Sequence, residues 1–346
     1  MNWISRSKVR LRLPASRQLA TMPGRSVSSD KTYSTAQQKD SQTLELPDGR
    51  VLGFAEYGSP TGKPILFFHG FPSSRLEAAG ILELVKRRDL RIIAPERPGF
   101  GLSTFNAQHR ITDWPADVRA LATQLGLARF AILGGSGGAP YALACARALP
   151  AETLSAVGLL APAAPWEAGI AGVPRSSRIA AFMGYYWPSS LRVLTAGVVG
   201  LCRWLASTNF VTRRIDRWLE ASEKGSATRS SSSPSTKSET SPTIQESRTA
   251  LLRFVFETFR QGTAPMVRES QLLTWEGWGF PLDEVRYDKV IIWHGVQDGQ
   301  SPIHMVRYLA KHLPHCELRE LEGETHFSMV KHLGTILEEL VPSDRK

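Results

Sequence analysis

Residues Phe130–Tyr141 of this 346-residue chain read FAILGGSGGAPY, and this stretch decides the fold. Its apolar start predicts a buried strand, and a helix is expected from the glycines to about residue 149. Between them, Gly134-Gly135-Ser136-Gly137-Gly138 satisfies the pattern G-x-S-x-G. A tight strand-to-helix turn strains the serine backbone, and neighbours without a Cβ atom avoid the resulting clashes. The stretch therefore predicts Ser136 as a nucleophile, with Gly134 and Gly138 supporting the turn.

The start of the predicted helix adds a second function to this turn. The first N–H groups of a helix have no partner inside it, so the N–H of Gly137 is free to bind a developing oxyanion. A phosphate-binding loop would need Lys-Ser or Lys-Thr after the glycines, and this sequence has neither. A glycine-rich turn without catalytic meaning remains the alternative.

Two residues further along the chain are candidate partners for Ser136. Asp298 follows the apolar run 290–293, and His326 lies between a predicted strand at 316–321 and the last predicted helix. A histidine there can reach a serine with one ring nitrogen and an aspartate with the other, which predicts His326 as the base and Asp298 as the acid that orients it. Other acids and histidines fit less well because they precede the strand or lie on or beside predicted helices: Asp283, Asp288, His304, His312, His315 and His332.

Strands and helices alternate along most of the chain. A hairpin is predicted over 42–57, around the Pro-Asp-Gly turn at 47–49. The later predicted strands cover 65–68, 91–94, 130–133, 157–160, 290–293 and 316–321. This alternation is typical of a mostly parallel sheet with helices on both faces.

The alternation of predicted strands and helices stops between residues 165 and 285, where no strand-like apolar runs occur. We expect one α/β core, residues 42–164 and 286–346, interrupted by a helical insertion at 165–285. Inside the insertion, residues 221–247 are dominated by Ser, Thr, Lys and Glu. Such a polar segment buries too little apolar surface to fold, so we expect a disordered loop there.

Residues 43–340 resemble the α/β-hydrolase superfamily, whose triad follows the chain order Ser, Asp, His. Besides the motifs above, ERPGFGLS at 96–103 is similar to the D-x-P-G-x-G-x-S segment of many members, with Glu96 in place of the aspartate. The resemblance implies the α/β-hydrolase fold, with residues 165–285 as a helical cap over the active site. Members with an aspartate nucleophile, such as epoxide hydrolases and haloalkane dehalogenases, are excluded because this chain has Ser136 at that position.

The same fold gives a role to His69-Gly70-Phe71-Pro72, which follows the predicted strand 65–68. In the α/β-hydrolase arrangement, the loop after this strand supplies the second N–H of the oxyanion hole, which here implies Phe71 beside Gly137. We expect His69 and Gly70 to shape this loop rather than to transfer protons. An ordinary glycine turn is the alternative.

The composition is that of a globular protein, with 42% hydrophobic and 21% charged residues. The net charge of +10 comes largely from residues 1–29, which hold six basic residues and no acidic one, so nucleic-acid binding gains little support. This acid-free, Arg- and Ser-rich stretch favours a mitochondrial transit peptide within a disordered tail at 1–41; the alternative is a cytoplasmic protein with a basic tail. The longest uncharged run, 17 residues between Arg129 and Arg147, is too short and too rich in glycine to span a membrane.

The sequence gives no reason to expect a metal or an organic cofactor. Its three cysteines, Cys145, Cys202 and Cys316, are widely spaced and predict neither a disulfide framework nor a metal site. Six of the nine tryptophans fall in the predicted insertion. We expect most of these six to form the core of the insertion, while their number also suggests a substrate with an apolar acyl or aromatic group.

The expected function is a serine hydrolase that cleaves an ester-like bond of a largely apolar small molecule through Ser136, His326 and Asp298. Two alternatives stay open. One is a carbon–carbon bond hydrolase or lyase that uses the same three residues, and the other is a non-catalytic binding protein on the same fold.

Overall fold

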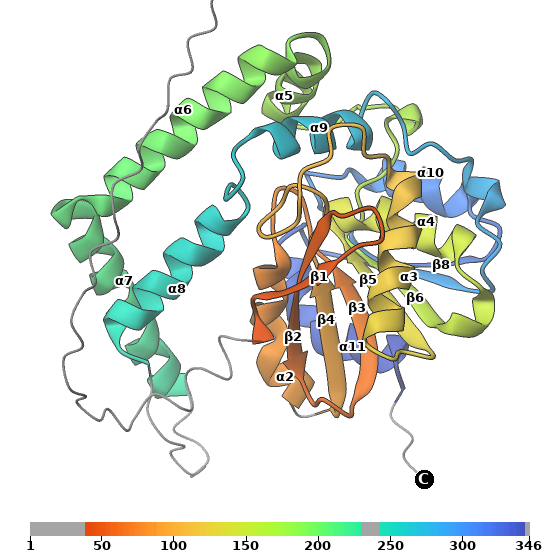
Figure 1. Ribbon diagram of the computed structural model, residues 1–346, viewed down its shortest axis with the longest axis horizontal. Helices are drawn as coiled ribbons and strands as arrows, with labels where there is room; N and C mark the ends of the chain where they lie inside the picture. The colour runs from red at the N-terminus through yellow and green to blue at the C-terminus, as the bar shows by residue number, and fades with distance from the viewer. Residues whose placement is uncertain (1–38, 87, 230–241, 343–346) are drawn as a thin grey trace, which may run out of the picture.

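A single eight-stranded sheet forms the centre of the molecule (Figure 1). The computed structural model describes residues 39–86, 88–229 and 242–342. In chain order, the strands are β1 (Gln42–Glu45), β2 (Val51–Gly58), β3 (Lys63–Phe68), β4 (Leu90–Pro95), β5 (Phe130–Gly135), β6 (Leu154–Leu160), β7 (Val290–Gly295) and β8 (Cys316–Leu321). Their order across the sheet is β1-β2-β4-β3-β5-β6-β7-β8.

The hairpin β1–β2 forms one edge of the sheet and is antiparallel to its neighbour β4, whereas all pairs from β4 to β8 are parallel. Parallel strands that are covered on both faces read as continuous apolar runs, as Ile65–Phe68 and Phe130–Leu133 do. Alternate side chains of these runs enter opposite layers: Leu66 and Phe68 pack on one side of the sheet and Ile65 and Phe67 on the other.

Helices cover both faces of the sheet (Figure 1). The helices of the core are α2 (Leu82–Lys86), α3 (Trp114–Gln124), α4 (Ala139–Ala148), α10 (Ile303–His312) and α11 (Leu333–Leu340). Apolar residues of α3, α4 and α10 belong to the hydrophobic cluster on one face, and those of α2 and α11 belong to the cluster on the other. This arrangement confirms the predicted α/β fold.

The described residues between β6 and β7 form five α-helices. They are α5 (Arg175–Tyr186), α6 (Pro188–Ser207), α7 (Asn209–Arg229), α8 (Ile244–Glu257) and α9 (Ala264–Leu273). In Figure 1, α6 runs away from the sheet, α7 turns, and α8 returns toward the core, where α9 lies over the end of the sheet. Short 3₁₀ segments occupy Arg75–Ile81, Ile111–Asp113, Ser136–Gly138, Ala151–Thr153, Trp166–Ala168, Leu282–Glu284 and Ser328–His332.

Two predicted segments differ in their bounds from the structure. Residues 221–229 are the last turns of α7 and residues 244–247 the first turn of α8, so the loop predicted at 221–247 is too wide at both ends. Thr243 caps α8 in a capping box with Glu246, a local pair that outweighs the polar composition. The tail predicted at 1–41 is also too long, since Asp40 forms an ion pair of 2.8 Å with Arg253. Residues 1–38 and 230–241 lie outside the described residues.

Candidate active site

Ser136 stands at the turn between β5 and α4 with a backbone φ of +47°, a left-handed conformation that side chains disfavour. The turn is closely packed. A Cβ atom placed on Gly138 would lie 2.3 Å from the carbonyl oxygen of Phe68, and one placed on Gly134 would lie 2.8 Å from the carbonyl oxygen of Gly138. Both positions therefore require glycine, and the strained turn exposes the serine side chain at the end of β5.

The structure brings the three predicted catalytic residues together. His326 Nε2 lies 3.1 Å from Ser136 Oγ, and His326 Nδ1 lies 2.7 Å from Asp298 Oδ2. The three residues follow β5, β7 and β8, whose parallel register places their carboxyl ends at the same edge of the sheet. When Nδ1 donates to the carboxylate, Nε2 is left as an acceptor for the serine hydroxyl.

Asp298 is buried, and its carboxylate accepts hydrogen bonds on both oxygens. Oδ1 accepts from the backbone N–H groups of Gln300 at 2.7 Å and Ser301 at 2.9 Å, while Oδ2 faces His326. Burial alone would raise the pKa of this carboxyl, but the hydrogen bonds and the charge of His326 outweigh it, so the pKa lies below its ordinary value of 3.8. Asp298 is therefore ionised near neutral pH.

The two predicted oxyanion donors, Phe71 and Gly137, are neighbours in space. A Cβ atom placed on Gly137 would lie 2.6 Å from Phe71 Cβ and 3.3 Å from the Phe71 backbone nitrogen. A Cβ atom placed on Gly70 would lie 3.5 Å from Ser136 Cβ, so the loop passes directly over the serine. Both residues therefore lie near the serine, and their N–H groups remain the predicted donors to an oxyanion.

His69 is fully buried and lies in the loop beside this site. Its Nδ1 lies 2.9 Å from the carbonyl oxygen of Gly70, and its Nε2 accepts from the backbone N–H of Arg97 at 3.4 Å. Burial, followed by the nearby Arg97 charge, holds the pKa of His69 well below 6.5. His69 is therefore neutral, and its two ring nitrogens hold the loop.

Arg97 is a residue of this site that the sequence analysis missed. Its fully buried guanidinium donates to the carbonyl oxygens of His69 at 2.5 Å and Gly70 at 2.8 Å. The remaining Nε pairs with Glu269 of α9 at 2.7 Å, and the hydroxyl of Tyr141 donates to the same carboxylate at 2.6 Å. The sequence offered two signals for Arg97, its place after an apolar strand and its position in the ERPGFGLS segment, but nothing nearby identifies its partner.

Glu77 is a second missed residue. Its Oε2 accepts the backbone N–H of Gly70 at 2.9 Å, and its Oε1 would lie 3.7 Å from a Cβ atom placed on Gly135. Burial raises the pKa of this carboxyl above 4.5, although several hydrogen bonds oppose the effect. A carboxyl group therefore lies beside the nucleophile turn and holds the N–H of Gly70, whereas Arg97 holds its carbonyl oxygen.

His294 is a third missed residue, four positions before Asp298. It is fully buried, and its Nε2 lies 3.8 Å from Asp298 Oδ2. Burial lowers its pKa, so His294 is a neutral neighbour of the carboxylate. The sequence signal for His294 was its position in β7, the strand that leads to Asp298.

The helical insertion reaches this site through α9. Leu273 Cδ1 would lie 3.3 Å from a Cβ atom placed on Gly137, so the end of α9 covers the nucleophile turn. Glu257 of α8 forms a further link, with an ion pair of 2.6 Å to the buried Arg75. Arg75 also pairs with Glu96 at 2.7 Å, which gives the glutamate of the ERPGFGLS segment a structural role.

The prediction that most tryptophans of the insertion form its core is wrong. Trp166 is half-buried and Trp278 is buried against the sheet, but the other four are exposed. These four are Trp187, Trp204, Trp218 and Trp275, with exposed fractions of 58%, 63%, 59% and 44%. For two of them, Trp204 and Trp218, the reason is their place on α6 and α7, which lead away from the sheet (Figure 1).

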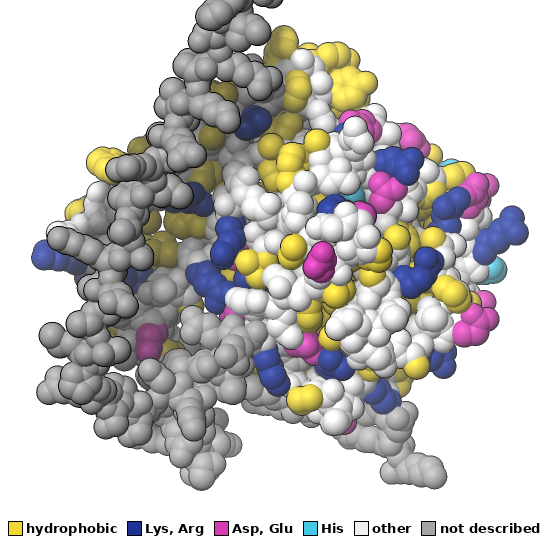
Figure 2. All heavy atoms as spheres, in the orientation of Figure 1, with side chains coloured by type: hydrophobic (Ala, Val, Ile, Leu, Met, Phe, Trp, Pro, Cys, Tyr) yellow, Lys and Arg dark blue, Asp and Glu magenta, His cyan; other side chains and the backbone are white. Residues whose placement is uncertain are grey.

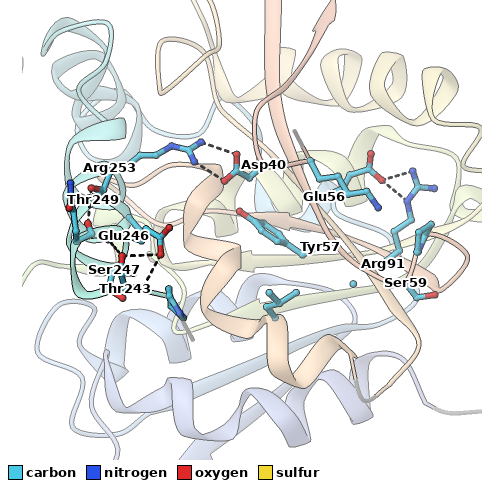
Figure 3. Close-up of a pocket in the computed structure, with 17 residues that line it drawn as sticks. Asp40, Glu56, Tyr57, Ser59, Arg91, Thr243, Glu246, Ser247, Thr249 and Arg253 are labelled. Atoms are coloured by element: carbon cyan, nitrogen blue, oxygen red, sulfur yellow. Dashed lines mark hydrogen bonds and ion pairs between the residues drawn. The ribbon is translucent and has the colours of Figure 1, made fainter. Parts of the chain in front are cut away.

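A large cavity of about 1040 Å³ lies elsewhere, between α8 and the edge of the sheet at β2 and β4 (Figure 3). Two ion pairs border it, Arg253 with Asp40 and Arg91 with Glu56, and Tyr57 lies between them. None of the predicted site residues lines this cavity.

Within the described ranges, no group of three or more His, Cys, Asp or Glu side chains could hold a metal ion. No described helix is long and apolar enough to cross a membrane.

Part of the chain matches known sequences. Residues 63–175 match the family model of the alpha/beta hydrolase fold. A proline iminopeptidase of Xylella fastidiosa is 32% identical over 121 residues, which are 33% of this chain and 37% of the relative. A non-heme chloroperoxidase of Streptomyces lividans is 32% identical over 117 residues, 33% of this chain and 42% of the relative. The chain thus matches less than half the length of these relatives.

Solved structures share the fold over a larger part of the chain. An esterase of a Rhodococcus species covers 87% of this chain and 100% of its own, with 17% identity and a TM-score of 0.53. A structure from work on carboxylesterases of the ammonia-oxidizing thaumarchaeon Nitrososphaera gargenis covers 86% of this chain and 97% of its own, with 15% identity and a TM-score of 0.55. At such identities the likeness concerns the fold alone.

Proposed function

We propose that this chain is a serine hydrolase of the α/β-hydrolase superfamily and that it cleaves an ester-like bond of a largely apolar small molecule. One observation carries the proposal: a continuous path of hydrogen bonds links Asp298, His326 and Ser136, with distances of 2.7 and 3.1 Å. The strained φ of Ser136 adds support, since strain of this kind concentrates at functional sites.

In the first half of the proposed reaction, Ser136 Oγ attacks the carbonyl carbon of the substrate while its proton passes to His326 Nε2. The carbonyl oxygen gains a negative charge, which the N–H groups of Phe71 and Gly137 stabilise. When the tetrahedral intermediate collapses, His326 returns the proton to the leaving oxygen. An alcohol departs, and the acyl group stays on Ser136.

In the second half, water replaces the alcohol. His326 removes a proton from the water as it attacks the acyl carbon, and the same proton then returns to Ser136 Oγ. A carboxylic acid leaves and the free enzyme is restored. Asp298 holds the imidazole in the required tautomer and stabilises its cation through both half-reactions.

We further propose that the insertion, residues 165–285, acts as a cap that selects apolar substrates. Leu273 of α9 and Phe71 both border the nucleophile turn, so an acyl group bound to Ser136 would contact apolar side chains. Pockets that are mostly apolar, with a few polar groups that fix orientation, are typical of small-molecule sites.

Covalent labelling tests the nucleophile. We expect a fluorophosphonate probe to label the wild-type protein at Ser136 and to leave Ser136→Ala unlabelled, with His326→Ala labelled far more slowly. Ser155→Ala is a matched control, since Ser155 is an exposed serine of β6 outside the predicted triad. If the wild type fails to label, a non-catalytic binding protein becomes the better interpretation. Equal labelling of Ser136→Ala would place the reactive group elsewhere.

A substrate panel then tests the bond. We expect hydrolysis of p-nitrophenyl esters with medium or long acyl chains and a weaker reaction with acetate. Vinylogous diketones in the same assay would detect carbon–carbon cleavage, and a prolyl anilide would detect the aminopeptidase activity named for the Xylella fastidiosa relative. Cleavage of either compound without cleavage of esters would overturn the ester assignment while leaving the triad in place.

A further inference from the structure

Helices α5 and α6 and the first part of α7, residues 175–222, make up the arm of the molecule. Hydrophobic side chains gather at the top of Figure 2, over α5 and the start of α6. More than ten large apolar side chains of the arm are exposed, among them Trp187, Trp204, Phe210 and Trp218. Monomeric soluble proteins rarely expose so much contiguous apolar surface, and such surfaces mark contacts with other molecules or with membranes.

The apolar side chains of α6 form a stripe. Leu194, Val198, Leu201 and Leu205 follow one another at intervals of four, three and four residues, so they share one face of the helix. All four are exposed, with Val198 at 61% and Leu201 at 55%. The stripe is therefore an apolar helix face that no other described element covers.

Helix α5 mixes arginine with apolar side chains on one exposed face. Arg175, Ile179, Phe182 and Tyr186 are again spaced by four, three and four residues, and all four are exposed. Aromatic rings beside arginines are typical of surfaces at the boundary between lipid and water, because the rings are partly polar and the long arginine side chain can reach outward.

The charge of the arm is strongly one-sided. Residues 175–222 hold seven arginines and two acidic residues, Asp216 and Glu220, and all seven arginines are exposed. Asp216 is already paired with Arg248 of α8 at 2.6 Å. The partner that covers the apolar surface must therefore carry negative charge.

The positive charge of the arm decides which of the candidate partners could cover its apolar surface. A second copy bound in a symmetric pair would set one basic arm against another. The N-terminal residues 1–29 of the same chain are also basic, with six positive residues and no acidic one. An anionic lipid surface has the opposite charge and an apolar interior, so it complements both features of the arm.

We propose that the arm binds the surface of an anionic lipid bilayer. The apolar face of α6 and the rings of α5 enter the boundary between headgroups and acyl chains, and the arginines contact the lipid phosphates. The helices lie in the interface rather than cross it, in agreement with the absence of a membrane-spanning helix among the described residues.

The arm is also connected to the candidate active site. Gln271 of α9 donates to the carbonyl oxygen of Gly184 in α5 at 2.8 Å, and α9 ends at Leu273 above the nucleophile turn. A bilayer bound by the arm therefore lies next to the element that covers Ser136. The binding itself does not depend on the proposed chemistry, and Ser136→Ala is expected to bind lipid as the wild type does.

Co-sedimentation with vesicles tests the proposal on the full chain. We expect the protein to bind vesicles of phosphatidylglycerol and phosphatidylcholine, to bind pure phosphatidylcholine vesicles at least about tenfold more weakly, and to lose affinity as salt rises. Vesicles with brominated acyl chains should quench tryptophan fluorescence, and less so in Trp204→Phe, because this ring is expected to reach the acyl boundary.

Two sets of variants separate the arm from other basic surfaces. Arg175→Glu with Arg178→Glu is expected to weaken binding about tenfold or more, since each basic group near an anionic surface contributes a several-fold factor. Val198→Ser with Leu201→Ser should weaken binding to a similar degree. The matched controls are Arg286→Glu with Lys311→Glu, and Val330→Ser, whose side chains are equally exposed but lie outside the arm.

Three results would overturn the proposal. The first is no binding to anionic vesicles at low salt. The second is binding by the arm variants equal to that of the wild type, which would assign the lipid contact to another segment such as the basic N-terminal residues. The third is a dimer in sedimentation equilibrium that Val198→Ser with Leu201→Ser dissociates, which would assign the apolar face to a second copy.

Discussion

Arg97 and Glu269 form an ion pair of 2.7 Å in which both side chains are almost fully buried, and this pair joins the end of β4 to helix α9. Because Arg97 also donates to two carbonyl groups of the loop at 69–70, the pair connects the insertion with the loop that carries a predicted oxyanion donor.

Removing Glu269 should therefore affect both stability and activity. Glu269→Ala leaves Arg97 buried without its counter-charge, and we expect the free energy of unfolding to fall by about 3–5 kcal/mol. We expect kcat for an ester substrate to fall by up to about 10²-fold, because the loop loses its fixed position. Urea unfolding and steady-state kinetics measure the two effects. Glu320→Ala breaks an exposed pair with Arg307 and should cost less than about 1 kcal/mol; an equal effect of both variants would contradict the role of the buried pair.

The packing of the nucleophile turn predicts a second effect. Gly138→Ala would place a Cβ atom 2.3 Å from the carbonyl oxygen of Phe68, so we expect a loss of about 1–3 kcal/mol or more together with the loss of fluorophosphonate labelling. Gly200→Ala is the matched control, because no atom lies within 4 Å of the new Cβ and α6 should gain up to about 1 kcal/mol from the better helix former. Similar urea midpoints for both variants would show that the nucleophile turn can accommodate a Cβ atom at position 138.

The orientation of His326 by Asp298 can be tested without removing either the nucleophile or the base. Asp298→Asn keeps the shape of the side chain but can favour the wrong imidazole tautomer, and we expect kcat to fall about 10⁴-fold with little change in KM. Asp283→Asn, an exposed aspartate that precedes β7, should leave kcat unchanged. Wild-type turnover by Asp298→Asn would mean that another group orients the histidine.

His109 should make stability depend on pH. It is buried beside Tyr141, and burial lowers its pKa from 6.5 to about 3. Above pH 6.5 the residue is neutral in both the folded and the unfolded chain. Between pH 6.5 and about 3, only the unfolded chain takes up the proton. Each pH unit by which the solution is acidified in this range therefore lowers the free energy of unfolding by ~1.4 kcal/mol through His109. Unfolding of the wild type and His109→Gln, measured from pH 7 to pH 4, should give a shallower slope in the variant. Parallel curves would show that His109 titrates alike in both states.

The N-terminal residues supply a prediction about localisation. We propose that they direct the chain to mitochondria, and a fusion of residues 1–40 to a fluorescent protein should then enter that compartment. Asp40 forms two hydrogen bonds with Arg253, at 2.8 and 2.9 Å, so removal of the tail should occur before residue 39. N-terminal sequencing of the processed protein checks this limit, and a cytosolic fusion would overturn the proposal.

Features that depend on a local sequence pattern could be predicted from the sequence alone. Apolar runs of four residues located β3, β5 and β7, and the glycines around Ser136 indicated a turn in which the structure leaves no space for a Cβ atom. The fold then placed Asp298 and His326 by chain order alone, because parallel strands carry their following loops to one edge of the sheet.

Features that depend on distant partners could not be predicted in this way. Arg97 and Glu269 are 172 residues apart, and nothing near either residue indicates the other. The tryptophans of α6 and α7 show a similar limit. Helical spacing shows which side chains share a face, but whether that face meets the core or the surroundings depends on the direction in which the helix leaves the sheet.

The place of the insertion between β6 and β7 has a consequence for how the chain can change in length. Val157 and Val290 are partners in the sheet although the whole insertion separates them. The entropy of closing such a loop rises by only about 0.6 kcal/mol for each doubling of its length, so shortening the insertion would barely alter the closure of the sheet. The obstacle to shortening is electrostatic: without Glu269, Arg97 would remain buried without its counter-charge, whereas Arg75 would keep its pair with Glu96. A trimmed chain would therefore have to replace Arg97 with an apolar residue in the same step.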